Sequence, residues 1–382
     1  MHMPALLKNF KTTLGRSSAM KIGVGFLMGV TIAGGVATAV TPSSPAIKAC
    51  VDNKTAAMYY SADGTCLKTR TAVDIGTGNF SVKSVAAAVT PSVVSVNVES
   101  ALGSGTGSGS IIGTSASSSY ILTNNHVVDS VSTSGTITVE FNNGDTTPAT
   151  IVGQDTVYDL AVLKVKVGNL PVIAFGDSSK LSIGDPVVAI GSPLGLASTV
   201  TSGIVSALNR PITTGAVGSE SYIDAIQTDA AINPGNSGGA LLDAAGRMVG
   251  VNAAIATLSS GSTSGSIGLG FSIPINEAKR IANELIATGT STRPVLGVTF
   301  DTNFAGVGAK ILRLTAGEGA AVAGIPVGSV IRSIDGVRVS DQISCIVRIR
   351  SYAPGSVVSV TVDLPTGTSK TFKVTLGSAV SQ

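Results

Sequence analysis

The sequence predicts a mainly β protein built on a pair of antiparallel barrels, with a membrane-spanning helix near its start. From about Ser84 onward, short β-branched segments alternate with Gly, Asn, Asp and Ser turns, as antiparallel barrels require. Charged residues make up only 12% of the chain, against about 25% in typical soluble domains. The third observation is an uncharged run from Ile22 to Val40, which is typical of a membrane helix. The length of 382 residues corresponds to about two to three domains.

Residues 1–21 form a basic tail, and residues 22–40 are predicted to be a transmembrane anchor with the tail in the cytoplasm. A cleaved signal peptide is the alternative, because Ala37-Thr38-Ala39 resembles a small-residue cleavage site. In both cases everything after Val40 is extracytoplasmic. If the anchor is kept, the chain is a single-pass protein of the cell membrane that contacts the bilayer through residues 22–40.

The charge balance argues against nucleic acid as a partner. The chain has 25 basic and 22 acidic residues, but four of the basic ones lie before residue 22. The remainder is nearly neutral and shows no basic stripe.

Residues 41–83 are expected to be an extracytoplasmic linker that contains a disulfide-closed hairpin. Cys50 and Cys66 flank the turn signal Ala62-Asp63-Gly64, and an oxidising compartment favours their pairing. A cross-link of that length contributes up to about 3 kcal/mol. The third cysteine, Cys345, lies in an apolar helical pattern, so we expect it to be buried and unpaired.

A serine flanked by glycines stands at the centre of the chain, in Gly235-Asn236-Ser237-Gly238-Gly239. Such a turn presents a hydroxyl without neighbouring Cβ atoms, and its backbone amides point at one spot where an oxyanion is stabilised. The bare motif is also compatible with an ordinary turn. As a nucleophile, Ser237 requires a base.

The chain has only two histidines, and His2 lies in the basic tail. His126, directly after the apolar segment Tyr120-Ile121-Leu122, is therefore the candidate base. Asp159 opens an apolar run and is the candidate for the carboxylate that orients the imidazole. Asp229 is the competitor, but it is close to Ser237 in sequence and is expected to support the turn instead. The order His126, Asp159, Ser237 is that of chymotrypsin-like proteases.

With these residues in place, the chain resembles the HtrA (DegP/DegS-type) family of trypsin-fold serine proteases with a C-terminal PDZ domain. The matching blocks cover roughly residues 90–380: Gly107-Ser108-Gly109-Ser110-Ile111-Ile112, Leu122 to Val128, Asp159 to Val165, Ile190 to Leu196, Gln227 to Gly239, Gly268 to Pro274, Val295 to Val298, Gly324 to Ile331, Ile334 to Gly336 and Pro354-Gly355.

The resemblance implies a two-lobed chymotrypsin-like protease domain over residues 84–289, in which the glycine-serine stretches 103–110 and 259–266 are surface loops. A helix from Asn276, its possible N-cap, to Gly289 closes this domain. A short linker from Thr290 to Pro294 then leads to an α+β PDZ domain over residues 294–378.

The resemblance also implies a role for each part of the site. The oxyanion hole is formed by Gly235, Asn236 and Ser237. The specificity pocket contains Ala231 and Ile232, whose apolar side chains favour small aliphatic residues before the cleaved bond. The PDZ peptide site comprises Leu296, Gly297, Val298 and Thr299, with the helix that begins near Asp341 supplying apolar side chains such as Ile343, Ile346 and Val347.

The function expected from the resemblance is extracytoplasmic serine endopeptidase activity on misfolded or unfolded proteins, as in protein quality control under stress. The expected partners are these substrates, peptide C-termini and two further copies in a homotrimer. No metal or cofactor is implied, because the second histidine is committed to the triad and no cysteine-histidine cluster exists. The alternatives are a non-catalytic chaperone or peptide-binding scaffold, and an esterase or lipase. The residue order and the absence of a G-x-S-x-G strand-turn-helix elbow disfavour the esterase or lipase.

Overall fold

The computed structural model describes residues 47–54, 58–60, 65–75, 80–101, 103–131, 134–192, 198–214, 221–253 and 266–381. The chain divides into two compact units, Met1–Thr77 and Gly78–Gln382, and each is described by itself. Within the described ranges, no helix has the length and apolar character needed to cross a bilayer. The apolar segment 22–40, on which the expected anchor depends, lies outside the described residues.

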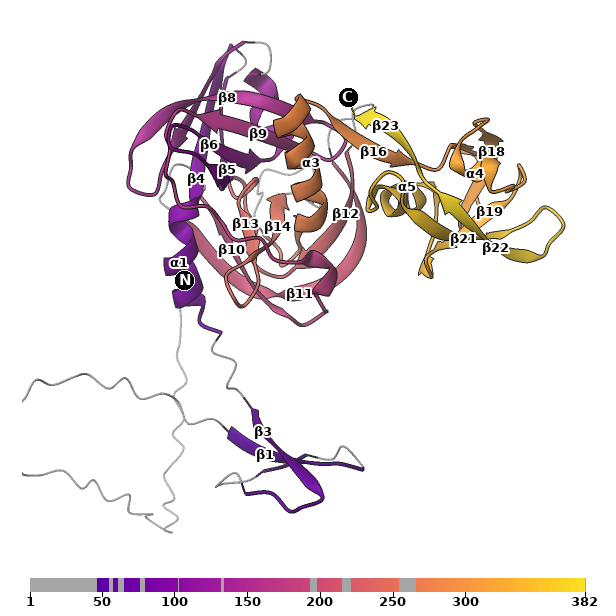
Figure 1. Cartoon of the computed structure of the whole chain (residues 1–382), viewed down its shortest axis with the longest axis horizontal. Helices are drawn as coiled ribbons and strands as arrows, with labels where there is room; N and C mark the ends of the chain where they lie inside the picture. Colours follow the sequence, from indigo (N-terminus) through magenta and orange to yellow (C-terminus); the bar gives the residue numbers. More distant parts are fainter. Residues whose placement is uncertain are drawn as a thin grey trace, which may run out of the picture. The chain divides into compact units, whose positions relative to one another are not determined.

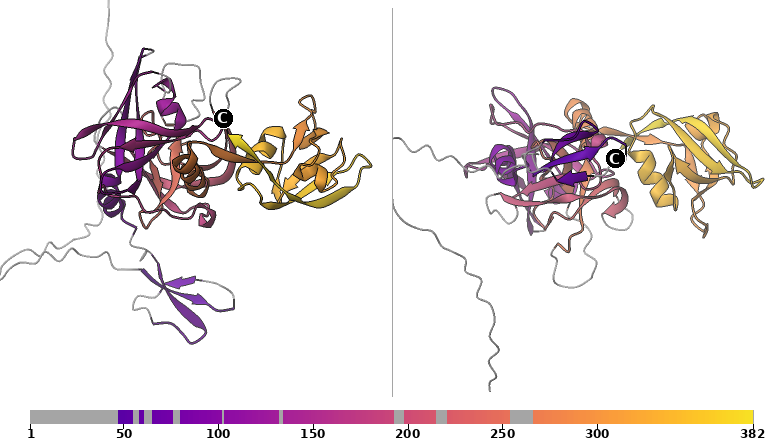
Figure 2. Two further views of the ribbon diagram at one scale, coloured as in Figure 1. Left: turned by 45° about the horizontal axis from the view of Figure 1, so that its top comes forward. Right: turned by 90° about the horizontal axis from the view of Figure 1, so that it is seen from below.

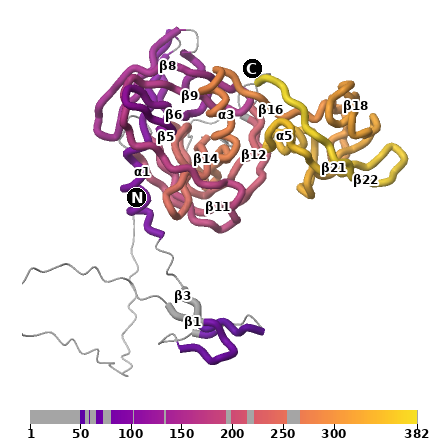
Figure 3. The backbone as a smooth tube through the Cα atoms, in the orientation of Figure 1, coloured from indigo at the N-terminus to yellow at the C-terminus, as the bar shows by residue number. Residues whose placement is uncertain are grey.

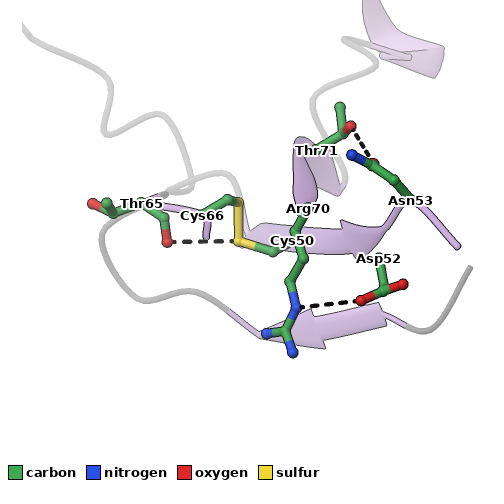
Figure 4. Close-up of a disulfide and its surroundings, with 7 residues drawn as sticks. All are labelled: Cys50, Asp52, Asn53, Thr65, Cys66, Arg70 and Thr71. Carbon is green, nitrogen blue, oxygen red and sulfur yellow. Dashed lines mark hydrogen bonds and ion pairs between the residues drawn. A yellow bond between two sulfur atoms is a disulfide. The ribbon is translucent and has the colours of Figure 1, made fainter. Parts of the chain in front are cut away.

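The first unit contains a small antiparallel sheet in which β1 (Ile47–Asp52) lies between β2 (Met58–Tyr60) and β3 (Arg70–Ile75). A disulfide joins Cys50 of the central strand to Cys66 (Figure 4). The Arg70 guanidinium stacks 3.6 Å from the centre of the Tyr59 ring and lies 3.9 Å from the Asp52 carboxylate. A sheet of this size has little core of its own, so the cross-link is a main source of its stability.

The second unit contains two closed antiparallel barrels (Figure 1). The first has the strand order β4-β5-β6-β9-β8-β7, formed by β4 (Val93–Ser100), β5 (Gly103–Thr114), β6 (Ser119–Thr123), β7 (Thr136–Glu140), β8 (Thr146–Asp155) and β9 (Leu160–Val165). The second has the order β10-β11-β12-β15-β14-β13, formed by β10 (Pro186–Gly191), β11 (Thr199–Thr214), β12 (Ser221–Thr228), β13 (Ala240–Leu242), β14 (Met248–Ala253) and β15 (Gly270–Pro274).

One apolar core joins the two barrels. It combines buried side chains of the first barrel, such as Leu122 and Val162, with Val188 and Ile190 of the second. β-Branched and leucine side chains that alternate along a strand pack well against such a pleated surface. Because the barrels share this core, the turns that emerge between them are held in fixed positions.

The glycine-serine stretch 103–110 was expected to be a surface loop, and this expectation is wrong. It lies in β5 and pairs with β4 over Ser100 to Val93. A Cβ on Gly107 would lie 2.6 Å from Val127, and one on Gly109 would lie 2.5 Å from Ile121. Glycine is therefore present here for close packing and not for flexibility. The stretch 259–265 lies outside the described residues.

Helices α1 (Val82–Val89) and α3 (Ile275–Thr288) belong to the two-barrel domain. α3 packs against β8, β9 and β14, and so covers both barrels (Figure 1 and Figure 2). It ends at Gly289 with φ +78°, as predicted, but its N-cap is Pro274 and not Asn276. The Asn276 side chain instead donates a 2.8 Å hydrogen bond to Asp177, which links the helix to a neighbouring loop.

The C-terminal part of the second unit is an α+β domain. Its sheet has the order β17-β18-β19-β21-β22, with β20 paired to β19. These strands are β17 (Val298–Phe300), β18 (Ala309–Leu314), β19 (Val330–Ile334), β20 (Val337–Arg338), β21 (Val357–Asp363) and β22 (Ser369–Thr375), and the helices are α4 (Gly319–Val322) and α5 (Gln342–Arg350). The unpaired Cys345 is buried in its core.

The segment expected to be a linker is a strand. β16 (Ser291–Val295) pairs with the last strand, β23 (Gly377–Ser381), so the two ends of the α+β domain lie side by side (Figure 3). The domain also packs on the second barrel through α5, which contacts β11 and β12. The Tyr158 hydroxyl donates a 3.1 Å hydrogen bond to the Arg350 carbonyl, and Arg348 lies 3.6 Å from Asp224.

A buried glutamate lies in α3 near this contact. Glu277 is 8% exposed, and its Oε1 atom has no hydrogen-bond partner among the described residues. Burial raises the pKa of Glu277 to about 8, and the charge of Asp224 adds to the rise against the attraction of Arg280. Because the folded-state pKa exceeds the ordinary value of 4.5, the folded chain binds the proton more tightly than the unfolded chain does.

We expect the contribution of Glu277 to stability to be fully present below pH 4.5 and to be lost as the pH rises towards 8. One pKa unit corresponds to about 1.4 kcal/mol, so Glu277→Gln should raise the free energy of unfolding by on the order of a few kcal/mol above pH 8. Urea unfolding at pH 5 and pH 8.5 measures this difference. The exposed Glu99 provides the control, since Glu99→Gln should have the same small effect at both pH values. A Glu277→Gln effect that does not grow with pH would contradict the assignment.

Candidate active site

The imidazole of His126 and the carboxylate of Asp159 form a polar pair on the first barrel. His126 lies in the short helix α2 (Asn125–Val128), directly after β6, and Asp159 lies in the turn between β8 and β9. The Asp159 Oδ2 atom is 2.8 Å from His126 Nδ1. Asp159 Oδ1 accepts a 2.9 Å hydrogen bond from the His126 backbone N–H. One carboxylate therefore holds both the ring and the backbone of the histidine.

The environment of His126 favours a basic imidazole. Burial lowers the pKa of His126, but the hydrogen bond and negative charge of Asp159, together with the charge of Asp129, outweigh burial and raise the pKa above 6.5. The Asp159 carboxylate on Nδ1 leaves Nε2 as the nitrogen that accepts a proton from a nucleophile.

Asp159 has a constrained backbone. Its φ is +54°, a region that aspartate enters more readily than most residues. Its carbonyl oxygen accepts a 2.8 Å hydrogen bond from the Asn124 side-chain amide, and Asp159 itself is only 3% exposed. The competing aspartate, Asp229, accepts a 2.7 Å hydrogen bond from the Ile204 backbone N–H and so supports the second barrel.

Ser237 lies in the turn before β13 and is 4% exposed. Gly235 and Gly238, on either side of it, have φ values of +95° and +84°, which glycine adopts at no steric cost. A Cβ on Gly238 would clash with the Ser108 carbonyl oxygen and with Thr123. The Asn236 N–H donates a 2.9 Å hydrogen bond to the Asn233 carbonyl, which closes the turn.

His126, Gly235 and Ser237 line one pocket of about 390 Å³, together with Val98, Ser100, Gly103, Ser104, Gly105, Thr106, Val127, Ser130 and Pro234. The structure thus brings the proposed base, nucleophile and oxyanion glycine to a single surface, with Asp159 buried behind His126. This arrangement suits attack on a carbonyl group, with the turn amides beside the nucleophile.

The two residues expected in the specificity pocket have different surroundings. Ala231 is half-buried, and its carbonyl oxygen accepts a 2.9 Å hydrogen bond from the Thr201 hydroxyl. Ile232 is 7% exposed and belongs to a core cluster of the second barrel with Val187 and Leu241. A role of either side chain in substrate selection stays a prediction.

The residues expected to bind peptide lie along a second pocket, in the α+β domain. Leu296, Gly297 and Val298 line a groove of about 400 Å³ with Arg293, Pro294, Val295, Phe300, Thr315, Glu318, Ile346, Ile349, Arg350, Ser378 and Ala379. Thr299 lies in β17, at the edge of the sheet. Of the three apolar α5 residues, Ile346 lines the groove, whereas Val347 is buried and Ile343 is 40% exposed.

Several supporting residues were not identified from the sequence. The amide of Asn124 fixes the Asp159 turn. The buried Asn252 side chain donates a 3.0 Å hydrogen bond to the Ala240 carbonyl just after the nucleophile turn, and its backbone carbonyl accepts one from Gly238. Ser108 bonds to Gly235. The only sequence signal for these residues was that short polar side chains interrupt apolar strands.

Among the residues that the structure describes, no three or more His, Cys, Asp or Glu side chains are grouped so that they could hold a metal ion.

Comparisons with known proteins agree with this geometry. The family model of the trypsin-like peptidase domain matches residues 107–251. The serine protease PepD of Mycobacterium tuberculosis is 49% identical over 311 residues, which is 78% of this chain and 66% of that protein. The serine protease Do-like HtrA of Lactococcus lactis is 39% identical over 294 residues, or 69% of this chain and 71% of that protein. This chain therefore spans about two thirds of the length of these relatives.

A solved structure titled as the HtrA-type protease AlgW with tripeptide matches 78% of this chain and 97% of its own, with 36% identity and a TM-score of 0.58. The two closed barrels, the His126, Asp159 and Ser237 geometry and these similarities lead to one conclusion. The chain belongs to the HtrA family of trypsin-like serine proteases.

Proposed function

We propose that the chain is an extracytoplasmic serine endopeptidase that cleaves unfolded or misfolded proteins through an acyl-enzyme. The observation that carries the proposal is the pair of hydrogen bonds that the Asp159 carboxylate accepts from His126, at 2.9 Å and 2.8 Å, with Ser237 lining the same pocket as His126. A buried carboxylate that orients a histidine beside a serine is the arrangement that activates a serine hydroxyl.

In the proposed reaction, His126 takes the proton of the Ser237 hydroxyl as its Oγ attacks the peptide carbonyl. Asp159 holds the imidazole in the tautomer with the proton on Nδ1 and stabilises the imidazolium. His126 then gives the proton to the leaving amine. In the second half of the reaction, His126 deprotonates a water molecule that attacks the acyl-enzyme, and it then returns the proton to the Ser237 oxygen as the product acid leaves. The backbone amides of Gly235 and Ser237 stabilise the tetrahedral oxyanion, a contribution of about 3 kcal/mol per donor.

The extracytoplasmic location is supported by the disulfide between Cys50 and Cys66, because such cross-links persist in oxidising compartments. The uncharged segment 22–40 supports delivery across a membrane, either as an anchor or as a signal segment.

Removing the nucleophile or the base tests the triad. We expect Ser237→Ala and His126→Ala each to lower kcat for an unfolded protein substrate by at least about 10⁴-fold, because the members of a triad act as a unit. The thermal unfolding midpoint should stay close to that of the wild type. Ser95, a buried serine without a side-chain partner among the described residues, provides the control Ser95→Ala, which should keep the wild-type rate. Cleavage by purified His126→Ala above a mock preparation would contradict the triad, and an inactive wild type would favour a binding scaffold.

The raised pKa of His126 gives a pH prediction. The base must be neutral to accept the proton, so kcat/KM should fall as the pH drops through the pKa of His126, with its acid limb above 6.5. Asp129→Asn removes one of the charges that raise this pKa, so the acid limb should move to lower pH. Asp145→Asn serves as the control, because Asp145 does not contribute to the shift. Measurement of kcat/KM across pH 5 to 9 shows whether the acid limb moves in Asp129→Asn and stays in place in Asp145→Asn. An acid limb at the same pH in Asp129→Asn as in the wild type would contradict the contribution of Asp129 to the pKa of His126.

We also propose that the α+β domain is a PDZ domain that binds peptide C-termini. An extended ligand would pair with the edge strand β17, and the amides of Leu296 and Gly297 would face its carboxylate. Gly297 has φ +77° and lies against the Glu318 side chain, so a Cβ would clash there. Arg293 and Arg350 add positive charge to the groove, against the single acidic side chain of Glu318.

The contact between this domain and the barrels supports coupling of peptide binding to proteolysis. Arg350 lines the groove, and its carbonyl oxygen accepts the hydrogen bond from Tyr158, which precedes Asp159. A ligand that moves the end of α5 would therefore act on the residue beside the catalytic aspartate.

Two α5 residues test the groove. Ile346→Ala should weaken binding of apolar-ended peptides to the full chain by about tenfold, because Ile346 lines the groove. Ile343→Ala should leave affinity unchanged, because Ile343 is exposed outside it. Titration with free and amidated peptides, combined with the protease rate at saturation, gives the measurement. Equal affinity for free and amidated C-termini would show that the Leu296 and Gly297 amides do not bind the carboxylate. An unchanged protease rate at saturation would show that peptide binding is not coupled to proteolysis.

A further inference from the structure

The peptide unit between Gly235 and Asn236 needs an external support. It lies between the backbone amides of Gly235 and Ser237, which are proposed to form the oxyanion hole. Gly235 has φ +95° and no Cβ, so its own sterics do not restrict the orientation of this peptide as they would for another residue. An oxyanion hole lowers the barrier only if its donors are oriented before the charge develops. Some other group must therefore fix the peptide.

Ser108 of the first barrel supplies that support. Its hydroxyl donates a 2.6 Å hydrogen bond to the Gly235 carbonyl oxygen. The other end of the same peptide is held by the 2.9 Å hydrogen bond from the Asn236 N–H to the Asn233 carbonyl. With both polar groups of the peptide engaged, rotation of this unit would break two hydrogen bonds at once.

Ser108 is itself fixed on all sides. Its Oγ accepts a 2.7 Å hydrogen bond from the Ser192 N–H at the end of β10. Its backbone N–H donates a 2.8 Å hydrogen bond to the Ser237 carbonyl, and its carbonyl oxygen accepts one of 2.7 Å from the Thr123 hydroxyl. The residue is fully buried, so water does not compete for these bonds.

These bonds cross from one barrel to the other. Ser108 lies in β5, whereas Gly235, Ser192 and Ser237 belong to the second barrel and its turns. Thr123 ends β6, three residues before His126. The side chain and backbone of Ser108 together thus connect the strands that carry the proposed base to the turn that carries the proposed nucleophile and oxyanion amides.

We propose that Ser108 is a positioning residue for catalysis, whose hydroxyl orients the Gly235–Asn236 peptide so that the oxyanion amides converge on the reacting carbonyl. This inference rests on the proposed proteolytic function. It gives Ser108 a role in the transition state, in which the oxyanion forms, and none in binding of the uncleaved peptide. Loss of the hydroxyl should therefore change kcat and leave KM nearly constant.

The experiment compares Ser108→Ala with Ser110→Ala. Ser110 is a buried serine two positions along the same strand, and its hydroxyl has no hydrogen-bond partner among the described residues. We expect Ser108→Ala to lower kcat by about 10- to 100-fold, less than the roughly 10²- to 10³-fold loss of a whole oxyanion donor. KM should stay within about twofold, and the acid limb of the pH profile, which reports on His126, should not move. Ser110→Ala should match the wild type.

A second readout isolates the oxyanion hole. A peptide boronic acid forms a tetrahedral anionic adduct with a serine hydroxyl and places an oxygen in the hole. Its inhibition constant should rise at least about tenfold in Ser108→Ala, while the KM of the matched peptide substrate stays constant. Ser108→Cys keeps a similar shape with a weaker donor and should give an intermediate kcat. If Ser108→Ala does not fold, kcat and KM are compared between Ser108→Cys and the wild type instead.

The outcomes separate this inference from the function on which it rests. A wild-type chain that does not cleave would overturn the proposed function and this inference together. An active wild type with a wild-type kcat in Ser108→Ala or Ser108→Cys would overturn the positioning role alone. An increase in KM without a change in kcat, or an equal loss in Ser110→Ala, would also overturn it, because each would indicate a general packing effect.

Discussion

The pair of hydrogen bonds between Asp159 and His126 is the interaction on which the site depends. Its two carboxylate oxygens bind the backbone and the ring of the histidine, and its own carbonyl is held by Asn124. The aspartate has a positive φ that would be unfavourable without these bonds. The folded first barrel thus holds Asp159 in this constrained conformation, and Asp159 in turn keeps His126 in one orientation.

Both barrels help to fix the positions of the site residues, because they share one apolar core. The second barrel presents the Ser237 turn, and hydrogen bonds from Ser108 in the first barrel reach the Gly235 and Ser237 carbonyl groups of that turn. Helix α3 packs over strands of both barrels. Because close-packed elements resist small displacements, a site that lies between two such barrels gains orientation from both.

Much of the candidate site could be predicted from the sequence, since only one histidine follows the N-terminal tail and Ser237 lies in the glycine-rich segment Gly235 to Gly239. The contacts of Ser108 and Asn252 could not, because each residue lies on a strand away from the turn and reaches it only in the folded chain. The stretch 103–110 was misjudged for the same reason. Composition indicated flexibility, whereas Gly107 and Gly109 are needed for close packing against Val127 and Ile121. The start of α3 was also misplaced, because Asn276 bonds to a neighbouring loop.

Ser237 is expected to be nucleophilic because Asp159 holds His126 in the orientation of a base. Covalent labelling with a fluorophosphonate, followed by peptide mapping, tests it most directly. We expect a label on Ser237 in the wild-type chain and a labelling rate lower by orders of magnitude in Asp159→Asn, in which the imidazole loses its anionic partner. A label on another residue, or equal labelling rates in the two chains, would contradict it.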